Sequence, residues 1–193
     1  SSIALPGTMY DASGKAYTSL PVLNSSMTLT ADKPAQTGYA FSDVQDPQHA
    51  YFKAIYWAAD AGITKGYPDG TFGIDRSCTR GEMMMFLWRY ARKPAPKTVS
   101  KSPFKDVPKS HAHYKAILWA AQKGITKGYD DGTFGINKTC TRGQIMTFIW
   151  RYAGQHKPKS NVSPFKDSIT PAYRTAVLWG AELKITHGCS DGT

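Results

Sequence analysis

The sequence predicts a mainly all-α protein built from tandem helix–loop–helix repeats. Several residues recur at near-constant intervals along the 193-residue chain. Trp57, Trp119 and Trp179 lie 62 and 60 residues apart, and an isoleucine and a D-G-T tripeptide keep the same two intervals. A fixed period is typical of repeat proteins, in which each unit buries its apolar face against its neighbours.

The spacing divides the chain into four segments. Repeat 1 spans residues 41–92, repeat 2 spans 103–154, and repeat 3 spans 164–193, where the sequence supplies the first half only. Residues 1–40 match no repeat, and we interpret them as an N-terminal segment, either a linker or the tail of a preceding domain. Within them "MYDASGKAYTSL" is typical of two short strands joined by a turn.

Apolar spacing predicts the first helix of each repeat. In repeat 1, Tyr51, Ile55, Ala58 and Ala59 fall on one helical face. The three tryptophans have matching places in this helix, so we interpret them as structural core residues, with a sugar-stacking role as the alternative.

The end of this helix is predicted from a residue that favours left-handed backbone. Gly62 and Gly124 stand at that place in repeats 1 and 2. Lys184 stands there in repeat 3, at a cost of about 1 kcal/mol if its backbone is left-handed.

The second helix begins at a Thr-Arg pair. Thr79 with Glu82, and Thr141 with Gln144, match the capping box S/T-x-x-E/Q, so we assign all four a structural role. One helix pair buries little by itself. We therefore expect residues 41–193 to stack and unfold as one unit.

An arginine follows each capping threonine. Arg80 and Arg142 occupy the first helical position, where a cation opposes the helix dipole by about 0.3–1 kcal/mol. Two interpretations are open. In the first the arginines are structural, and each is either solvated or paired with a carboxylate of a neighbouring repeat; in the second they bind a ligand. In the second case a carboxylate or phosphate is held by the arginine and by open N–H groups of the first turn.

The glycine-rich loop between the helices supplies the other candidate ligand residues. Its glycines either provide positive φ angles or let a sugar ring approach the backbone. The lysine after "GIT" is either solvated or part of an anion pocket. These candidates are Lys65, Gly66 and Gly70 in repeat 1, and Lys127, Gly128 and Gly132 in repeat 2.

Three cysteines show no metal-binding pattern. No C-x-x-C pair occurs and no histidine stands at zinc-finger spacing, so we expect no structural metal and no cofactor. One aspartate per loop is too few for calcium. Cys78 and Cys140 hold equivalent places in separate repeats, which seldom meet, so we interpret both as small buried thiols.

The charge limits the partners. A formal net charge of +10 favours nucleic acid, an acidic membrane surface or an acidic polysaccharide. We expect no membrane insertion, because no stretch approaches 18 consecutive apolar residues. We also expect no nucleic acid, because the positive charge concentrates between the repeats. No nucleophile–base pattern recurs, so we predict no catalytic residues and no enzyme.

Taken together, F-x-D-V, a helix with Trp, G-I-T-x-G-Y-x-D-G-T-F and T-R-G-E closely resemble the S-layer homology domain. The resemblance runs from Phe41 to Thr193. It implies a pseudo-threefold spindle of repeats around a central helix bundle. It also implies non-covalent attachment to secondary polymers of the Gram-positive-type cell wall, which often carry pyruvate ketals.

The resemblance also carries residue roles. The arginine of the family's T-R-A-E motif matches Arg80 and Arg142, whereas the alanine of that motif is replaced by Gly81 and Gly143. It implies a module that anchors a larger secreted protein at the bacterial cell surface by binding acidic, for example pyruvylated, wall polysaccharide. The alternative is a structural or protein-interaction array with no glycan ligand.

Overall fold

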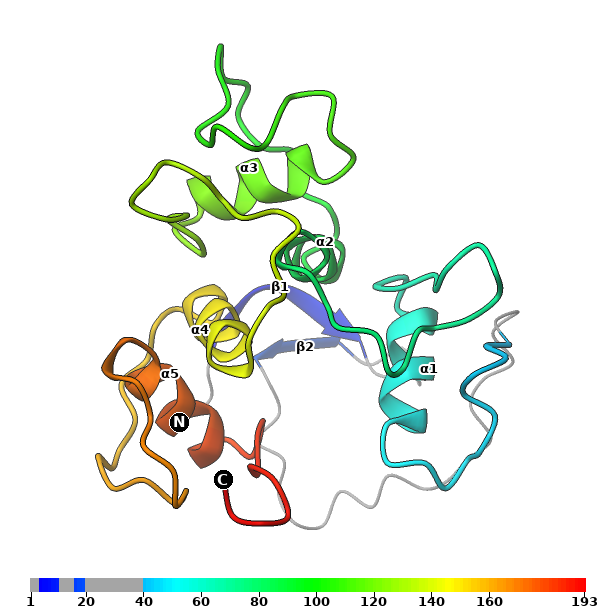
Figure 1. Cartoon of the computed structure of the whole chain (residues 1–193), viewed down its shortest axis with the longest axis vertical. Coiled ribbons are helices and arrows are strands. Elements are labelled where there is room, and N and C mark those ends of the chain that lie inside the picture. Colours follow the sequence, from blue (N-terminus) through cyan, green and yellow to red (C-terminus); the bar gives the residue numbers. More distant parts are fainter. Residues whose placement is uncertain (1–3, 11–15, 20–39) are drawn as a thin grey trace. The chain divides into compact units, whose positions relative to one another are not determined.

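A computed structural model describes residues 4–10, 16–19 and 40–193 (Figure 1). Strands β1 (Ala4–Tyr10) and β2 (Ala16–Ser19) pair antiparallel, with a register irregularity between Ala4 and Met9. The two predicted strands are thus present, and the predicted turn between them lies outside the described residues. The strands belong to one compact unit, residues 1–35, and all the helices belong to another, residues 36–193.

The second unit confirms the mainly α-helical prediction. Its described helices come in the predicted order, two from each complete repeat and one from repeat 3. None of the helices in the described ranges is long and apolar enough to cross a membrane. They are α1 (Phe52–Asp60), α2 (Arg80–Tyr90), α3 (Tyr114–Gln122), α4 (Arg142–Tyr152) and α5 (Pro171–Glu182).

Capping boxes start α2 and α4. The Glu82 N–H donates to Thr79 Oγ1 at 3.2 Å, and the Thr79 N–H donates to Glu82 Oε2 at 2.7 Å. The Thr141 and Gln144 pair repeats both bonds at 3.3 and 3.4 Å. Each box satisfies two N–H groups that a helix start would otherwise leave open.

Left-handed residues end the first helices. Gly62, Gly124 and Lys184 have φ values of 68°, 70° and 57°. The N–H of the following residue then reaches back to the helix, as Ile63 does to Ala58 O at 2.8 Å. Lys184 therefore adopts the backbone that glycine adopts in the other two repeats, as the sequence predicted.

The helices pack across repeat boundaries. The second helix of each complete repeat lies against the first helix of the next one, α2 beside α3 and α4 beside α5 (Figure 1). The largest hydrophobic cluster joins Met84 and Leu87 of α2, Ile117 and Trp119 of α3, and Phe148 of α4. This cluster joins repeats 1 and 2, which supports their cooperative unfolding, whereas a separate cluster lies within repeat 1. The spindle arrangement stays a prediction.

Helix α1 is packed differently from α3 and α5. Its Ile55 and Ala59 are buried against Phe41 of the same repeat. Trp119 and Trp179 are 3% exposed, whereas Trp57 is 55% exposed. The prediction that all three tryptophans belong to the core is therefore wrong for Trp57. The physical reason is that α3 and α5 each receive the second helix of the preceding repeat, and the described residues supply no such helix for α1.

Candidate ligand-binding site

An aspartate organises each complete glycine loop. Asp106 accepts the N–H groups of Phe134, Gly135 and Ile136 at 2.6, 2.7 and 3.2 Å, and Asp43 binds the matching loop of repeat 1 in the same way. Burial raises the pKa of Asp106, but these N–H groups outweigh it and leave the pKa below its usual value. Sequence reasoning missed this role, although the signal was present as the Phe-x-Asp that opens every repeat.

The loop glycines have structural reasons to be glycine. Gly128 has a φ of 72°, and a Cβ there would lie 2.5 Å from a ring carbon of Phe104 and 2.6 Å from Thr133 O. Gly66 is enclosed in the same way by Phe41. Gly70 and Gly132 both have φ values of 81°. Their contact with a sugar stays a prediction.

Arg80 crosses from repeat 1 into the loop of repeat 2. Its Nε donates to Phe134 O at 2.9 Å. Its guanidinium carbon lies 4.6, 4.8 and 5.2 Å from the ring centroids of Tyr129, Phe134 and Phe148. The side chain is 4% exposed. Arg80 is therefore a buried cation held by aromatic faces and a carbonyl oxygen.

The same loop covers the start of α2. The Arg80 N–H donates to Lys138 O at 2.9 Å, and the Gly81 N–H donates to Ile136 O at 3.0 Å. The expectation of open first-turn N–H groups is therefore wrong for this helix. The reason is that the loop of the next repeat docks its carbonyl oxygens on the helix end, and these dipoles also offset the cation.

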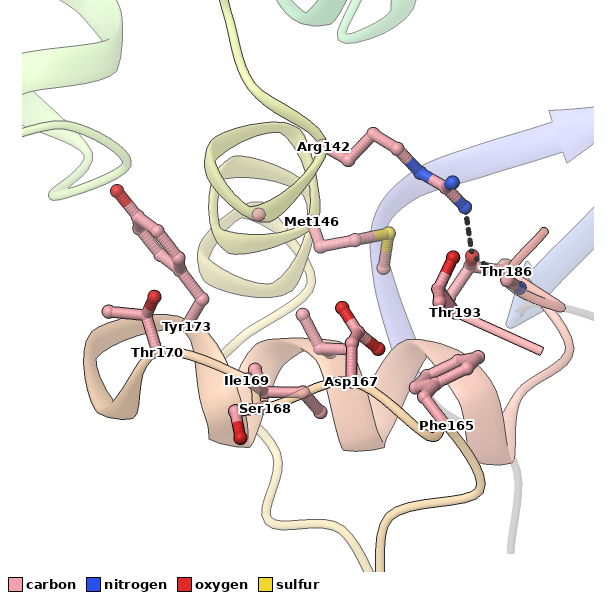
Figure 2. Close-up of a pocket in the computed structure, with 13 residues that line it drawn as sticks. Arg142, Met146, Phe165, Asp167, Ser168, Ile169, Thr170, Tyr173, Thr186 and Thr193 are labelled. Carbon is pink, nitrogen blue, oxygen red and sulfur yellow. Dashed lines mark hydrogen bonds between the residues drawn. The ribbon is translucent and has the colours of Figure 1, made fainter. Parts of the chain in front are cut away.

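Arg142 makes the matching crossing from repeat 2 to repeat 3. Its Nη1 donates to Cys189 Sγ at 2.6 Å. Its Nη2 donates to Thr186 Oγ1 at 3.5 Å (Figure 2). Cys189 stands where repeat 2 has Tyr129, and the positions that match Phe134 and Phe148 come after Thr193. Among the described residues no aromatic ring covers this guanidinium, and Arg142 is exposed. Within the described residues, no acceptor meets the backbone N–H of Arg142 or Gly143.

A pocket of about 240 Å³ opens beside Arg142. Arg142 and Met146 line it from α4, and Tyr173 lines it from α5 (Figure 2). The carboxylate of Asp167 points into the space between these helices (Figure 2). Asp167 corresponds to Asp106, and the positions that correspond to the backbone donors of Asp106 come after Thr193. The pocket therefore presents a cation and a carboxylate from opposite sides.

The structure groups only some of the predicted ligand residues. Arg80 lies at the loop that carries Lys127, Gly128 and Gly132. Lys65 and Lys127 are both exposed. Among the described residues, no arginine of a Thr-Arg pair contacts the first loop, which carries Lys65, Gly66 and Gly70.

Neither Thr-Arg arginine has a carboxylate partner in the described part of the chain. The ion pairs found there are Arg76 with Asp69 at 3.3 Å and Lys159 with Glu182 at 3.6 Å. The described residues also contain no group of three side chains suited to a metal ion. Each described junction thus holds an arginine without an ion-pair partner, and a backbone carbonyl oxygen accepts from the side chain of Arg80 only.

Comparison with known families identifies the repeats. Residues 40–84 and 103–146 match the model of the S-layer homology domain. Repeats 1 and 2 are thus similar to S-layer homology domains. The match confirms the resemblance seen in the sequence. Its second segment lies within repeat 2, and its first begins one residue before repeat 1.

Relatives of these S-layer homology repeats are cell-surface proteins. The chain is 28% identical to Cell surface glycoprotein 1 of Acetivibrio thermocellus, over 83% of this chain and 7% of that protein. It is 32% identical to Cell surface protein of Thermoanaerobacter kivui, over 59% of this chain and 15% of that protein. It is also 32% identical to Cellulosome-anchoring protein of A. thermocellus, over 58% of this chain and 25% of that protein. The chain thus spans a quarter or less of each relative, and the comparisons support cell-surface location and anchoring.

Proposed function

We propose that the chain is a non-covalent anchoring module whose junctions between repeats bind acidic groups of a cell-wall polysaccharide. One observation carries the proposal. The Thr-Arg arginine of each complete repeat reaches the next repeat and meets no carboxylate there. The relatives are much longer than the matched region, so the module fits as one part of a larger secreted protein.

Arg142 is the stronger ligand candidate of the two arginines. Its guanidinium is exposed at the pocket, and its protein partners are a thiol and a distant hydroxyl. A charge-assisted hydrogen bond to a carboxylate is worth about 1.5–3 kcal/mol, so an acidic group displaces these partners favourably. Two-pronged contact with a carboxylate also suits the planar guanidinium better than an ammonium group.

The pocket suits a sugar that carries an acid at one side. The acid binds beside Arg142, away from the carboxylate of Asp167, because like charges repel. Asp167 accepts hydrogen bonds from sugar hydroxyls, and the ring of Tyr173 offers an apolar face. A neutral sugar makes only the contacts with Asp167 and Tyr173, so the acidic substituent decides the affinity.

A second candidate, a structural array without a glycan ligand, is favoured by Arg80. This side chain already has aromatic faces and the Phe134 carbonyl oxygen as partners, and it is almost fully buried. Such an arginine stabilises the junction whether or not a ligand is present.

Retention on purified cell walls separates the two functions. The folded chain is mixed with walls before and after chemical removal of the secondary polymer. We expect retention on intact walls, and at least about tenfold less on stripped walls and for Arg142→Ala. Lys53→Ala is the matched control, because it removes the same charge from an exposed site on α1 and should leave retention unchanged. Equal retention on stripped walls rules out the glycan function.

A further inference from the structure

Two cysteines of different repeats lie directly opposite each other. Thr79 and Thr139 form an isolated antiparallel bridge. The Cys140 N–H donates to Cys78 O at 2.8 Å, and a matching bond follows on the other side of the bridge. The expectation that equivalent cysteines do not meet is wrong, because the start of α2 docks on the loop of the next repeat.

The backbone geometry matches a disulfide. Opposite residues of an antiparallel pair send their side chains to the same side, and their Cα atoms lie about 4.5–5.5 Å apart. Disulfides span Cα separations of about 4.4–6.8 Å. Cys78 and Cys140 also contact the same hydrophobic cluster, in which Cys140 is 7% exposed. Both residues therefore contact one apolar cluster, and the Cys78 thiol donates to Thr79 O at 3.4 Å.

We propose that Cys78 and Cys140 form a disulfide that joins repeats 1 and 2 in the oxidising environment of the cell surface. The oxidant is a small-molecule disulfide. The Cys78 thiolate attacks it, forming a mixed disulfide and releasing one thiol. The Cys140 thiolate then attacks the Cys78 sulfur and releases the second thiol. Two protein thiols lose two protons and two electrons, and one external disulfide is reduced.

Exposure sets the order of these steps. Cys78 is partly exposed and reacts first, whereas Cys140 is buried and closes the bond. Apolar burial raises the pKa of Cys78 to about 12, with Glu82 and Cys140 adding to the effect, and raises the pKa of Cys140 to about 11. The thiolates are scarce at neutral pH, so the bond forms slowly, and its burial also shields it from reductants.

The bond would fix the junction that holds Arg80. Cys78 lies two residues before Arg80, and Cys140 lies in the segment that covers the start of α2. Oxidation closes a loop from one repeat to the next and constrains the unfolded chain. Cys189 takes no part, because it lies against Arg142 at the other junction.

The test uses the full chain, reduced and then incubated with mixtures of oxidised and reduced glutathione. Remaining thiols are alkylated and the protein is digested with trypsin without reduction. We expect a linked pair of peptides, Ser77–Arg80 with Thr139–Arg142, and an alkylated Cys189. The melting temperature of the oxidised protein should exceed that of the reduced protein by about 5–15 °C.

Single variants control for other pairings. Cys78→Ala and Cys140→Ala should each abolish the shift in melting temperature, whereas Cys189→Ser should keep it. Three alkylated cysteines in the folded wild type, or a link that involves Cys189, overturn the proposal. A Cys78–Cys140 link that forms only in urea overturns it as well. The peptide map of the wild type decides the matter even if a variant fails to fold.

Discussion

The guanidinium carbon of Arg80 in repeat 1 lies 4.6 Å from the ring centroid of Tyr129 in repeat 2. The equivalent pair at the next junction is Arg142 with Cys189, which offers a thiol in place of a ring. The same motif therefore gives a buried arginine at one junction and an exposed arginine at the other. Under the proposed function, the first arginine mainly holds the repeats together and the second binds the ligand.

This difference predicts unequal effects on stability. Arg80→Ala should lower the free energy of unfolding by about 2–4 kcal/mol, because it removes aromatic contacts and a buried hydrogen bond. Arg142→Ala should change it by less than about 0.5 kcal/mol. Urea denaturation of the two variants measures both values. Equal losses would show that the junctions are energetically alike.

The tryptophans provide a second matched pair. Trp119→Ala should cost about 3–5 kcal/mol, because it empties a site in the largest core cluster. Trp57→Ala should cost less than about 1 kcal/mol, because the residue is exposed and its ring centroid lies 6.5 Å from that of Tyr90. Thermal and urea denaturation test the difference. A Trp119→Ala protein that keeps its stability but loses wall binding would make that residue a sugar platform.

Close packing around Gly81 explains why glycine replaces the alanine of the family's T-R-A-E motif. A Cβ there would lie 2.7 Å from His113 Nδ1 and 3.0 Å from Ile136 O. Gly81→Ala should therefore lower the free energy of unfolding by about 1–3 kcal/mol, although alanine favours helices by about 1 kcal/mol. The double variant with His113→Ala should recover part of the loss. A more stable Gly81→Ala protein would contradict the close packing.

Local features of the fold could be predicted from the sequence, because they depend on neighbouring residues. Thr79 with Glu82 forms its capping box within one helical turn, and Gly62 and Lys184 end their helices through their own backbone angles.

Contacts between repeats could not be predicted in this way. Nothing local indicates that Arg80 meets Tyr129, or that Cys78 lies opposite Cys140, because both contacts depend on which repeat the start of α2 docks against. Trp57 has the same sequence surroundings as Trp119, and its exposure depends on a partner helix. The sequence could therefore nominate the arginines but not say what surrounds them.

Acid should destabilise the fold. Burial lowers the pKa of His113 below 6.5, His111 and Arg89 lower it further, and Glu82 opposes them. The folded state keeps His113 neutral, so its contribution is complete above the unfolded pKa of 6.5 and is lost as the pH falls from there through the lower folded pKa. Asp43 and Asp106, whose pKa values are lowered, add a further loss as the pH falls below 3.8.

Urea denaturation between about pH 7.5 and 5 tests the histidine contribution. The free energy of unfolding should fall across this range in the wild type, and His113→Gln should flatten the curve. Stability that is constant or rises toward pH 5 would contradict the assignment.

Titration of an acidic wall polymer against the folded protein tests the central claim most directly. The proteins are the wild type, Arg142→Ala, Arg142→Lys and the control Lys53→Ala, with folding checked by circular dichroism. Arg142→Ala should bind about ten- to a hundredfold more weakly, because one charge-assisted contact is lost, and Arg142→Lys should restore little. Lys53→Ala should bind the acidic polymer as tightly as the wild type does. Polymer stripped of its acidic groups should bind the wild type and Arg142→Ala equally weakly. Equal affinity of all four proteins for the acidic polymer would contradict the account.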